Sequence, residues 1–182
     1  MPAMNIRIEK VESQAAYERT LDVRREVFVY EQNVSEAEEV DPFTEDQIVY
    51  LLWLDDKPVA TGRLRVKDSI LKFERIATLK AFRGQGLAQQ IMQALEKEGF
   101  QKFPHHLGVL NAQLSALGFY EKLLWQSFGE IFEEANIAHR SMYKLNPAHK
   151  DPKHLQIWGC CSKLASELRS KLPSEWGRQQ AR

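Results

Sequence analysis

The sequence has little cysteine and no long apolar run. Its two cysteines, Cys160 and Cys161, are adjacent, which suits neither a disulfide framework nor the ligand spacing of a tetrahedral zinc site. No segment approaches the roughly 18–20 consecutive apolar residues that cross a bilayer, and the N-terminal stretch MPAMNIRIEK lacks the apolar core of a signal peptide. We therefore expect reduced structural thiols in a soluble, cytoplasmic protein that has no membrane partner.

Net charge is also absent. The 25 Lys and Arg residues balance the 25 Asp and Glu residues, so the formal net charge is +0. A neutral chain has no overall attraction to nucleic acid or to an anionic membrane, so neither is an expected partner. Any bound anion must be held by a local site.

Metal-ligand spacing is missing as well. His105, His106, His149 and His154 show no spacing to carboxylates or thiols that is typical of a metal site. The sequence therefore predicts no metal.

The sequence does contain a hydrophobic pattern suited to one packed core. The chain has 182 residues and is 43% hydrophobic, which is enough for one domain and too short for two comfortable ones. Alternating runs indicate strands, and stripes of helical period indicate helices. Together they predict a mixed α/β fold with a mostly antiparallel central sheet flanked by helices. In chain order we expect strands at 4–11, 47–54, 58–67, 70–79, 105–112, 125–132 and 138–145, and helices from Ser13, at 84–98 with Gly99 as its end, and at 113–124.

The segment 35–47 is acidic and is interrupted by Pro42. It predicts a short helix followed by a mobile loop, and loops of this kind often line substrate sites. Its acidity favours a cationic or polyamine-like ligand.

The composition changes near the C-terminus. Residues 147–182 predict a linker followed by an amphipathic helix at 155–172, whose apolar stripe includes Trp158. Such a stripe is expected to cover the domain formed by residues 1–146 or the partner subunit of a homodimer.

The stretch RGQGLA, from Arg83 to Ala88, lies between a predicted strand and a predicted helix. Small residues there let the backbone N–H groups of the first helical turn approach a ligand, and the helix dipole favours an anion such as pyrophosphate. No Lys-Ser or Lys-Thr follows, which excludes a Walker loop, and no third glycine follows, which excludes a Rossmann fingerprint. By spacing alone, a sharp turn without a ligand is an equal alternative.

Four blocks of the sequence occur in an order that is similar to one known family. They are VRREVFVYEQNV (23–34), ERIATLKAFRGQGLA (74–88), AQLSALGFYEKL (112–123) and IAHRSMYK (137–144). This order resembles the GNAT superfamily of acyl-CoA-dependent N-acyltransferases, and its ElaA-like branch in particular. The family's phosphate loop reads Gln/Arg-x-x-Gly-x-Gly/Ala, a pattern that Arg83, Gly86 and Ala88 fill.

The resemblance implies a coenzyme A site with acetyl-CoA as the acyl donor. In the family, the backbone of the strand before the loop bonds the pantetheine arm and polarises the thioester carbonyl, and the loop holds the pyrophosphate. The residues expected at the cofactor are Ile76, Ala77 and Thr78 for the pantetheine arm, and Arg83, Gly84, Gln85, Gly86, Leu87 and Ala88 for the pyrophosphate.

A phenol and two amides complete the implied cofactor set. Tyr120 occupies the place of the family's phenol, which bonds the coenzyme A sulfur and protonates the leaving thiolate; the alternative is a core aromatic beside Phe119. Gln113 stands where the family often has an asparagine that bonds the cofactor amides, and Asn111 is a rival donor.

The general base has two candidates. Glu74 leads into the loop and would accept a proton through water, or it pairs with Arg63 or Arg65 across the strands. His139 matches a histidine of the branch, and it acts in catalysis and substrate binding or only orients a loop.

Arg25 and Glu31 lie on the N-terminal helix, whose end borders the acceptor site in the family. They are expected to contact the acceptor, or to form an ion-pair network on the helix surface. Two departures from the family pattern concern the acceptor side: Leu124 replaces the glycine that usually ends its helix, and Ala138 replaces the proline before the histidine.

The resemblance thus implies an acetyl-CoA-dependent N-acetyltransferase that transfers an acetyl group to a primary amine by direct attack in a ternary complex. The acceptor is a small-molecule amine or a peptide amine. The alternative function is a non-catalytic acyl-CoA-binding sensor or regulatory module, because an intact phosphate loop with a degraded acceptor side would bind without turnover.

Overall fold

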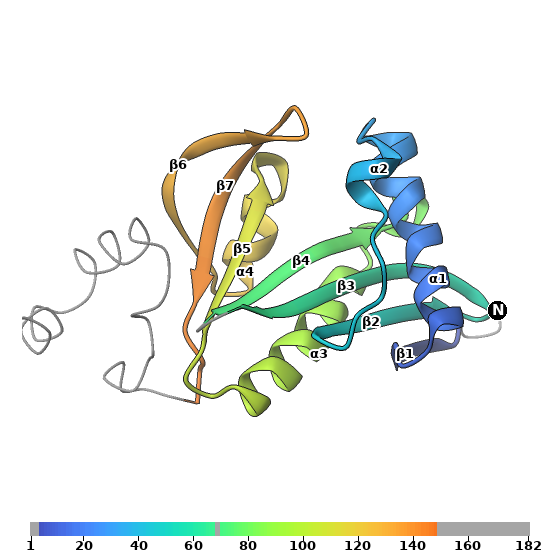
Figure 1. Cartoon of the computed structure of the whole chain (residues 1–182), viewed down its shortest axis with the longest axis horizontal. Coiled ribbons are helices and arrows are strands. Elements are labelled where there is room, and N and C mark those ends of the chain that lie inside the picture. The colour runs from blue at the N-terminus through green and yellow to red at the C-terminus, as the bar shows by residue number, and fades with distance from the viewer. Residues whose placement is uncertain (1–3, 68–69, 149–182) are drawn as a thin grey trace, which may run out of the picture. The chain divides into compact units, whose positions relative to one another are not determined.

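The computed structural model describes residues 4–67 and 70–148 (Figure 1). These residues divide into two compact units, one built from residues up to 65 together with 73–99, the other from 66–72 and residues from 100 onward. Each unit is described by itself. The amphipathic helix predicted at 155–172 lies outside the described residues, so it stays a prediction, as does the boundary after residue 146.

The first unit contains most of four strands and three α-helices, and its strands follow the order β1-β2-β3-β4 in the sheet. A π-helix extends the first helix, and a 3-10 turn follows the fourth strand. The elements are β1 (Ile6–Lys10), α1 (Gln14–Arg24), the π-helix (Arg25–Glu31), α2 (Glu36–Glu39), β2 (Gln47–Leu54), β3 (Lys57–Lys67), β4 (Ile70–Thr78), the 3-10 turn (Lys80–Phe82) and α3 (Leu87–Lys102).

Opposite faces of the first unit's sheet carry different helices. On one face, Tyr17 of α1 belongs to a buried cluster with Leu51 of β2 and Ala77 of β4. On the other face, α3 approaches β3 so closely that a Cβ atom at Gly62 would lie 2.5 Å from Ile91 Cγ2. The sheet therefore has an α1 face and an α3 face (Figure 1).

The first helix begins as predicted and ends differently. Ser13 is its N-cap, because Ser13 Oγ accepts a hydrogen bond from the backbone N–H of Ala16 at 3.2 Å. Beyond Arg24 the helix continues as the π-helix Arg25–Glu31. Such turns are rare and often occur at functional sites. Tyr30, near the end of this segment, is 65% exposed.

The second unit contains a three-stranded antiparallel sheet in the order β5-β7-β6. Its core includes Leu110, Trp125 and Met142. The elements are β5 (Leu107–Gln113), a 3-10 turn (Leu114–Ala116), α4 (Leu117–Lys122), β6 (Gln126–Glu134) and β7 (Ile137–Lys144).

The predicted bounds of the helix at 84–98 are wrong at both ends. Both glycines of the loop have positive φ angles, 75° and 76°, so α3 begins only after them, and it continues through Gly99 to Lys102. The last turn persists because Phe100 is buried and reaches Gly108, where an added Cβ atom would lie 3.1 Å from its ring. Burial of this ring outweighs the weak helix propensity of glycine.

The helix predicted over 113–124 is also shorter than expected, since it divides into the 3-10 turn and α4. Leu124 ends it in the conformation that a glycine usually takes, with φ 68°. The backbone N–H of Leu124 bonds the Glu121 carbonyl at 3.0 Å, and that of Trp125 bonds the Tyr120 carbonyl at 3.1 Å. These two bonds are those of a Schellman cap, so the missing glycine leaves the helix exit intact.

The remaining expectations agree with the structure. The strands at 47–54 and 58–67 form the predicted antiparallel hairpin of β2 and β3, with Leu51 opposite Thr61. The seven strands and flanking helices confirm the predicted mixed α/β fold. In the described part of the chain, no helix has the length and apolar character needed to cross a membrane.

Candidate active site

A bulge in β4 precedes the glycine loop. Glu74 bonds Arg63 and so lies on the α1 face, whereas Ile76 lies on the α3 face, where its Cδ1 would be 2.6 Å from a Cβ atom at Gly62. In a regular strand, residues two apart share a face. Arg75 between them has φ 57°, and this left-handed residue changes the alternation. The bulge therefore places the side chains of both Glu74 and Arg75 on the α1 face.

The glycine loop leaves open space in front of α3. Cβ atoms built at Gly84 and Gly86 would meet no heavy atom within 4 Å. The first bond of the helical pattern runs from the backbone N–H of Gln90 to the Gly86 carbonyl at 3.2 Å. The N–H groups of residues 87–89, at the start of α3, therefore have no helical carbonyl one turn back. Positive φ angles, small residues and a helix start together form a suitable seat for an anion.

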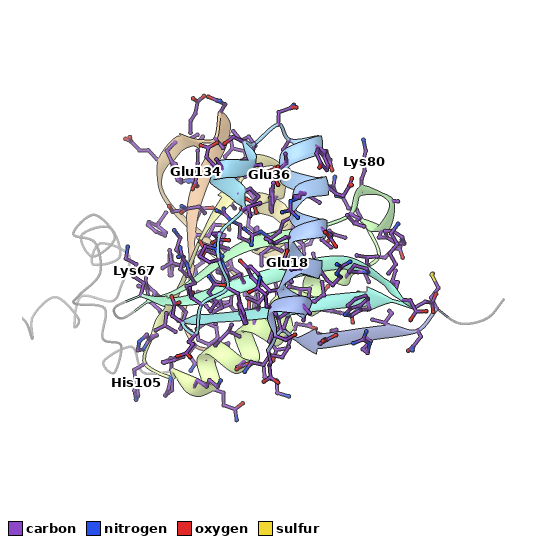
Figure 2. All side chains as sticks on the ribbon, turned by 45° about the vertical axis from the view of Figure 1, so that its right-hand side comes forward. Glu18, Glu36, Lys67, Lys80, His105 and Glu134 are labelled. Atoms are coloured by element: carbon purple, nitrogen blue, oxygen red, sulfur yellow. The ribbon has the colours of Figure 1, made fainter. Side chains whose placement is uncertain are left out.

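Arg83 joins the loop to both the end of β4 and the end of the π-helix. Its Nε donates to the Thr78 carbonyl at 3.0 Å, and its Nη1 and Nη2 donate to the Glu31 carboxylate at 2.7 and 2.6 Å. The hydrogen bonds from Arg83 lower the pKa of Glu31 below its usual value. The structure thus brings together a residue predicted for pyrophosphate and one predicted for the acceptor. Lys80 beside them is exposed and points outward (Figure 2).

Thr78 carries an unsatisfied hydroxyl. Its Oγ1 is buried and has no hydrogen-bond partner among residues 4–67 and 70–148. A buried polar atom without a partner is destabilising, and a bound ligand is one common reason to keep it. The hydroxyl, the open loop and the start of α3 fit the pantetheine arm and phosphates of coenzyme A. The sequence had assigned only the backbone of Thr78 to that arm.

Glu74 is held by two arginines. Arg63 contacts its carboxylate at 3.1 Å and Arg65 at 2.5 Å, which is the pairing that the sequence offered as the alternative to catalysis. Both of these contacts are to Oε1, so a water molecule would have to compete with two guanidinium groups for this oxygen. The part of Glu74 as general base stays a prediction, and these contacts do not favour it.

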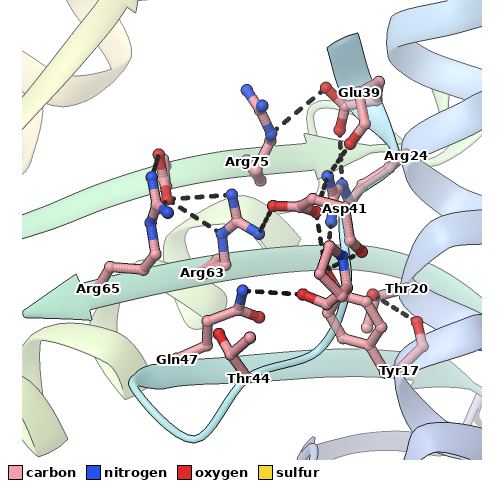
Figure 3. Close-up of polar contacts among 12 residues, drawn as sticks. Tyr17, Thr20, Arg24, Glu39, Asp41, Thr44, Gln47, Arg63, Arg65 and Arg75 are labelled. Carbon is pink, nitrogen blue, oxygen red and sulfur yellow. Dashed lines mark hydrogen bonds and ion pairs between the residues drawn. The ribbon is translucent and has the colours of Figure 1, made fainter. Parts of the chain in front are cut away.

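A buried ionic network fixes the acidic segment onto the α1 face (Figure 3). Arg24 contacts Glu39 at 2.6 Å and Asp41 at 3.0 Å, and Arg63 contacts Asp41 at 2.5 Å. Both guanidinium side chains are only 2% exposed. Burial opposes ionisation of Asp41, yet Arg63 and Arg24 lower its pKa to about 2. For Glu39, burial dominates over Arg24 and raises the pKa.

These contacts occupy much of the acidity of segment 35–47. Besides the two carboxylates above, Glu36 pairs with Arg25 at 2.8 Å. The sequence predicted that Arg25 contacts the acceptor or forms an ion pair on the helix surface. The contact with Glu36 is an ion pair of the second kind, and the acceptor contact stays a prediction. A cationic ligand would have to compete with arginines for these carboxylates, which weakens the charge argument made from the sequence.

In the second unit, Tyr120 is buried with a free hydroxyl. The residue is 8% exposed, its ring contacts Phe119 edge to face with centroids 4.9 Å apart, and its hydroxyl bonds no residue in the described parts of the chain. Burial raises the pKa of this phenol well above its usual value, so it stays protonated at neutral pH. It is suited to donate a proton to a ligand atom.

His139 and the two candidate amides share one face of β5 and β7. Gln113 lies opposite His139, and Asn111 lies opposite Ser141, whose hydroxyl donates to Asn111 Oδ1 at 3.0 Å. His139 Nδ1 is 2.7 Å from the Ile137 carbonyl. A carbonyl can only accept, so this contact assigns the proton of the neutral ring to Nδ1 and leaves Nε2 as an acceptor.

The predicted site residues therefore form two groups. The loop, the end of β4, Glu74, Arg25 and Glu31 belong to the first unit, and Asn111, Gln113, Tyr120 and His139 belong to the second. Sequence reasoning missed Arg75 and the carboxylates of Glu39 and Asp41. The only signal for Arg75 was a charge at a position where the alternation of Leu71, Phe73 and Ala77 predicts an apolar residue. Nothing in segment 35–47 marked which carboxylates are buried.

Comparisons with known proteins identify a family. The acetyltransferase (GNAT) domain family matches residues 8–146. YyaT of Bacillus subtilis is 36% identical over 144 residues, which cover 75% of this chain and 94% of that protein. YjcF of the same organism, which bears the name of an N-acetyltransferase, is 41% identical over 123 residues, which cover 67% of this chain and 87% of that protein.

A solved structure agrees with these matches. The crystal structure of Escherichia coli ElaA is similar with a TM-score of 0.68 and 25% sequence identity, covering 78% of this chain and 99% of that one. ElaA of Escherichia coli is also similar in sequence, with 30% identity over 126 residues, which cover 67% of this chain and 82% of that protein. The open glycine loop between β4 and α3, the order of the four sequence blocks and these matches lead to one conclusion: the chain belongs to the GNAT acetyltransferase family, in its ElaA-like branch.

Proposed function

We propose that the protein uses acetyl-CoA to acetylate a primary amine by direct attack in a ternary complex. Membership of the family implies transfer of an acyl group from an acyl-CoA to an amine. The observation that supports a donor site in this chain is the glycine loop, which has open space in front of it and the unsatisfied Thr78 hydroxyl beside it. The identity of the acyl group as acetyl stays a prediction.

The first unit supplies the groups that would hold the donor. Backbone N–H groups from Gly84 to Ala88 and the Arg83 guanidinium would bind the pyrophosphate, because helix starts and arginine both favour phosphate oxygens. The backbone of Ile76–Thr78 and the Thr78 hydroxyl would bind the pantetheine arm. A phosphate at the loop would compete with the Glu31 carboxylate for the Arg83 guanidinium.

The transfer forms one bond and breaks one bond. The acceptor nitrogen bonds to the acyl carbon, the bond from that carbon to sulfur breaks, the nitrogen loses a proton and the departing thiolate gains one. We assign the acid to Tyr120, because its buried phenol is protonated at neutral pH and its hydroxyl has no partner in the described residues. A phenol that carries its proton before the reaction can give that proton to the departing thiolate.

For the base we favour His139 over Glu74. The contact of His139 Nδ1 with the Ile137 carbonyl leaves Nε2 as a proton acceptor, whereas Glu74 is already bound by Arg63 and Arg65.

A binding experiment tests the donor site. Wild-type protein should bind acetyl-CoA in isothermal titration calorimetry with one site per chain. Gly86→Asp should weaken binding at least about tenfold, because it adds a negative charge at the phosphate seat and forces a side chain into a positive-φ position. Ala15→Asp adds the same charge at an exposed position of α1 and should bind as wild type does. No binding by the wild-type protein at millimolar acetyl-CoA contradicts the proposal.

Turnover separates the enzyme from its alternative. Release of the coenzyme A thiol, measured over a panel of amines and peptides, supports an acetyltransferase. Tight donor binding without thiol release from any acceptor supports the sensor or regulatory module instead, and the paired state of Glu74 is the observation in its favour. The amine acceptor, the homodimer, the cytoplasmic location and the absence of nucleic-acid partners stay predictions.

A further inference from the structure

Arg75 is the least satisfied guanidinium of the ionic network on the α1 face. Its Nε lies 3.3 Å from Glu39 Oε2 without hydrogen-bond geometry, although that nitrogen is buried. Its Nη2 reaches the Glu38 carbonyl only at 3.4 Å. Figure 3 shows one dashed line from Arg75, to Glu39. Two of the three nitrogens thus have long contacts, and Nη1 has no partner in residues 4–67 and 70–148.

The network has more arginines than carboxylates. Within the described residues it joins four arginines to three carboxylates, and each carboxylate has a close partner other than Arg75. The close pairs are Arg24 with Glu39 at 2.6 Å, Arg63 with Asp41 at 2.5 Å and Arg65 with Glu74 at 2.5 Å. Arg75 only shares Glu39 with Arg24, so one positive charge remains without a carboxylate of its own.

The guanidinium of Arg75 is accessible to solvent. The Arg75 side chain is 30% exposed, whereas those of Arg24 and Arg63 are 2% exposed. A planar guanidinium with free N–H groups binds a carboxylate in bidentate fashion, which is its most favourable exposed pairing. An external anion can therefore reach Arg75, and the two buried arginines are closed to it.

The position of Arg75 places this charge next to the end of β4, where we propose that the acyl donor binds. The residue directly precedes Ile76–Thr78, the segment proposed to bind the pantetheine arm, and its positive φ turns its side chain to the α1 face. A backbone of this kind is unfavourable for a non-glycine residue and persists where the surrounding structure requires it. A substrate held by Arg75 would lie beside the end of β4 that carries the Thr78 hydroxyl.

We propose that Arg75 binds a carboxylate on the acceptor, so that the substrates are amines that also carry a carboxylate, such as amino acids, and not polyamines. This inference rests on the proposed acetyltransferase function. It replaces the cationic acceptor suggested by the acidity of segment 35–47, whose carboxylates at Glu36, Glu39 and Asp41 are bound by arginines.

The experiment compares acceptors that differ only in the carboxylate. Glycine, β-alanine and 4-aminobutyrate are each assayed against their amides, with putrescine as the cationic comparison. Thiol release gives kcat/KM, which is referred to the unprotonated amine because amides lower the basicity of a nearby amine. We expect at least one acid to be preferred over its amide and over putrescine by about tenfold or more.

Variants connect this preference to Arg75. Arg75→Gln should lower kcat/KM for the preferred acid by about 10–100-fold and change that for its amide by less than about twofold, because only the acid loses a charge-assisted pair. Arg75→Lys keeps the charge without the planar fork and should retain part of the preference. Arg19→Gln removes an equal charge from an exposed position of α1 and should leave the preference unchanged. Circular dichroism melting checks that each variant folds.

Several results overturn the inference. Preference for amides or putrescine does so, and so does an equal loss for acid and amide in Arg75→Gln. If no acceptor reacts, calorimetry with N-acetylglycine and N-acetylglycinamide in the presence of coenzyme A decides: equal affinities, or no binding of the acid, overturn it, and loss of acid binding in Arg75→Gln supports it. Failure of the acetyltransferase function itself is distinct, because it appears as absent acetyl-CoA binding and absent thiol release.

Discussion

Arg83 and Glu31 form a bidentate ion pair between the glycine loop and the end of the π-helix, with N–O distances of 2.7 and 2.6 Å. The two residues are 52 positions apart in the chain. Both side chains are partly exposed, at 41% and 31%, so the pair is weak enough to exchange for a phosphate. The Glu31 carboxylate thus binds the guanidinium that we propose for the phosphates of coenzyme A.

Glu31→Gln should tighten acetyl-CoA binding about twofold to fivefold. Without the carboxylate, Arg83 is free to bind phosphate, and an exposed ion pair of this kind contributes about 0.2–1 kcal/mol. Calorimetry measures the change in affinity. Glu26→Gln removes an equal charge from an exposed position of the same π-helix and should bind as wild type does. Weaker binding in Glu31→Gln would show that Glu31 supports the donor site and does not compete for it.

Tyr120→Phe should lower kcat about 100-fold while acetyl-CoA binding changes less than about twofold, if the phenol protonates the thiolate. The hydroxyl bonds no described residue, so its removal leaves no protein group unpaired and folding should be unaffected. Thiol-release assays measure kcat, and calorimetry measures the affinity for acetyl-CoA. Tyr143→Phe, which removes a hydroxyl that donates to Gln126 at 2.9 Å, serves as the control. Unchanged turnover in Tyr120→Phe assigns the ring to the core alone.

Asp41→Asn should lower the free energy of unfolding by about 2 kcal/mol at pH 7. The folded pKa of Asp41 is about 2 against an ordinary 3.8, so its stabilisation is present above pH 4 and is lost as the pH falls toward 2. Urea unfolding at pH 7, 4 and 3 should therefore show a difference from wild type that shrinks with acidity.

Asp46→Asn is the matched control for this titration, because Asp46 is exposed and lies in the same acidic segment. Its difference from wild type should be below about 0.5 kcal/mol and should not depend on pH. A constant difference between wild type and Asp41→Asn across the pH range would contradict the assignment of the stabilisation to the charged carboxylate.

Leu124→Gly should raise the free energy of unfolding by about 0.5–1 kcal/mol. A left-handed conformation costs an ordinary residue about 1–2 kcal/mol, and the extra freedom of glycine in the unfolded chain offsets about 0.5–1 kcal/mol of the gain. Little apolar burial is lost, because Leu124 is 75% exposed. Leu124→Ala keeps the strained backbone and should stay within about 0.5 kcal/mol of wild type in urea unfolding. A destabilised Leu124→Gly would point to contacts of the leucine side chain.

Several features of the fold could be predicted from the sequence because they depend on neighbours in the chain. Two runs of strand-forming residues, 47–54 and 58–67, are separated by a short polar turn and indicated the hairpin of β2 and β3. The glycines of RGQGLA indicated the turn before α3. The order of the four blocks indicated the family, which the comparisons confirm. Periodicity and turn chemistry are local, so no tertiary information was needed.

Other features required the tertiary structure because they join distant residues. The run of α3 past Gly99 depends on the burial of Phe100, which helix propensity does not register. The bulge at Arg75 depends on how β4 meets its neighbours, and it decides that Glu74 faces Arg63 and Arg65. Sequence spacing offered both pairing and catalysis for Glu74.

By itself, then, the sequence determined the order of elements, the family and the position of the glycine loop, all of which follow from local patterns. Only the tertiary structure decided which carboxylate each arginine binds. It pairs Glu31 with Arg83, and it leaves Arg75 with only a long contact to a carboxylate that Arg24 also binds. The reason is physical: an ion pair depends on the distance between charges in space, and the chain sets that distance only when it folds.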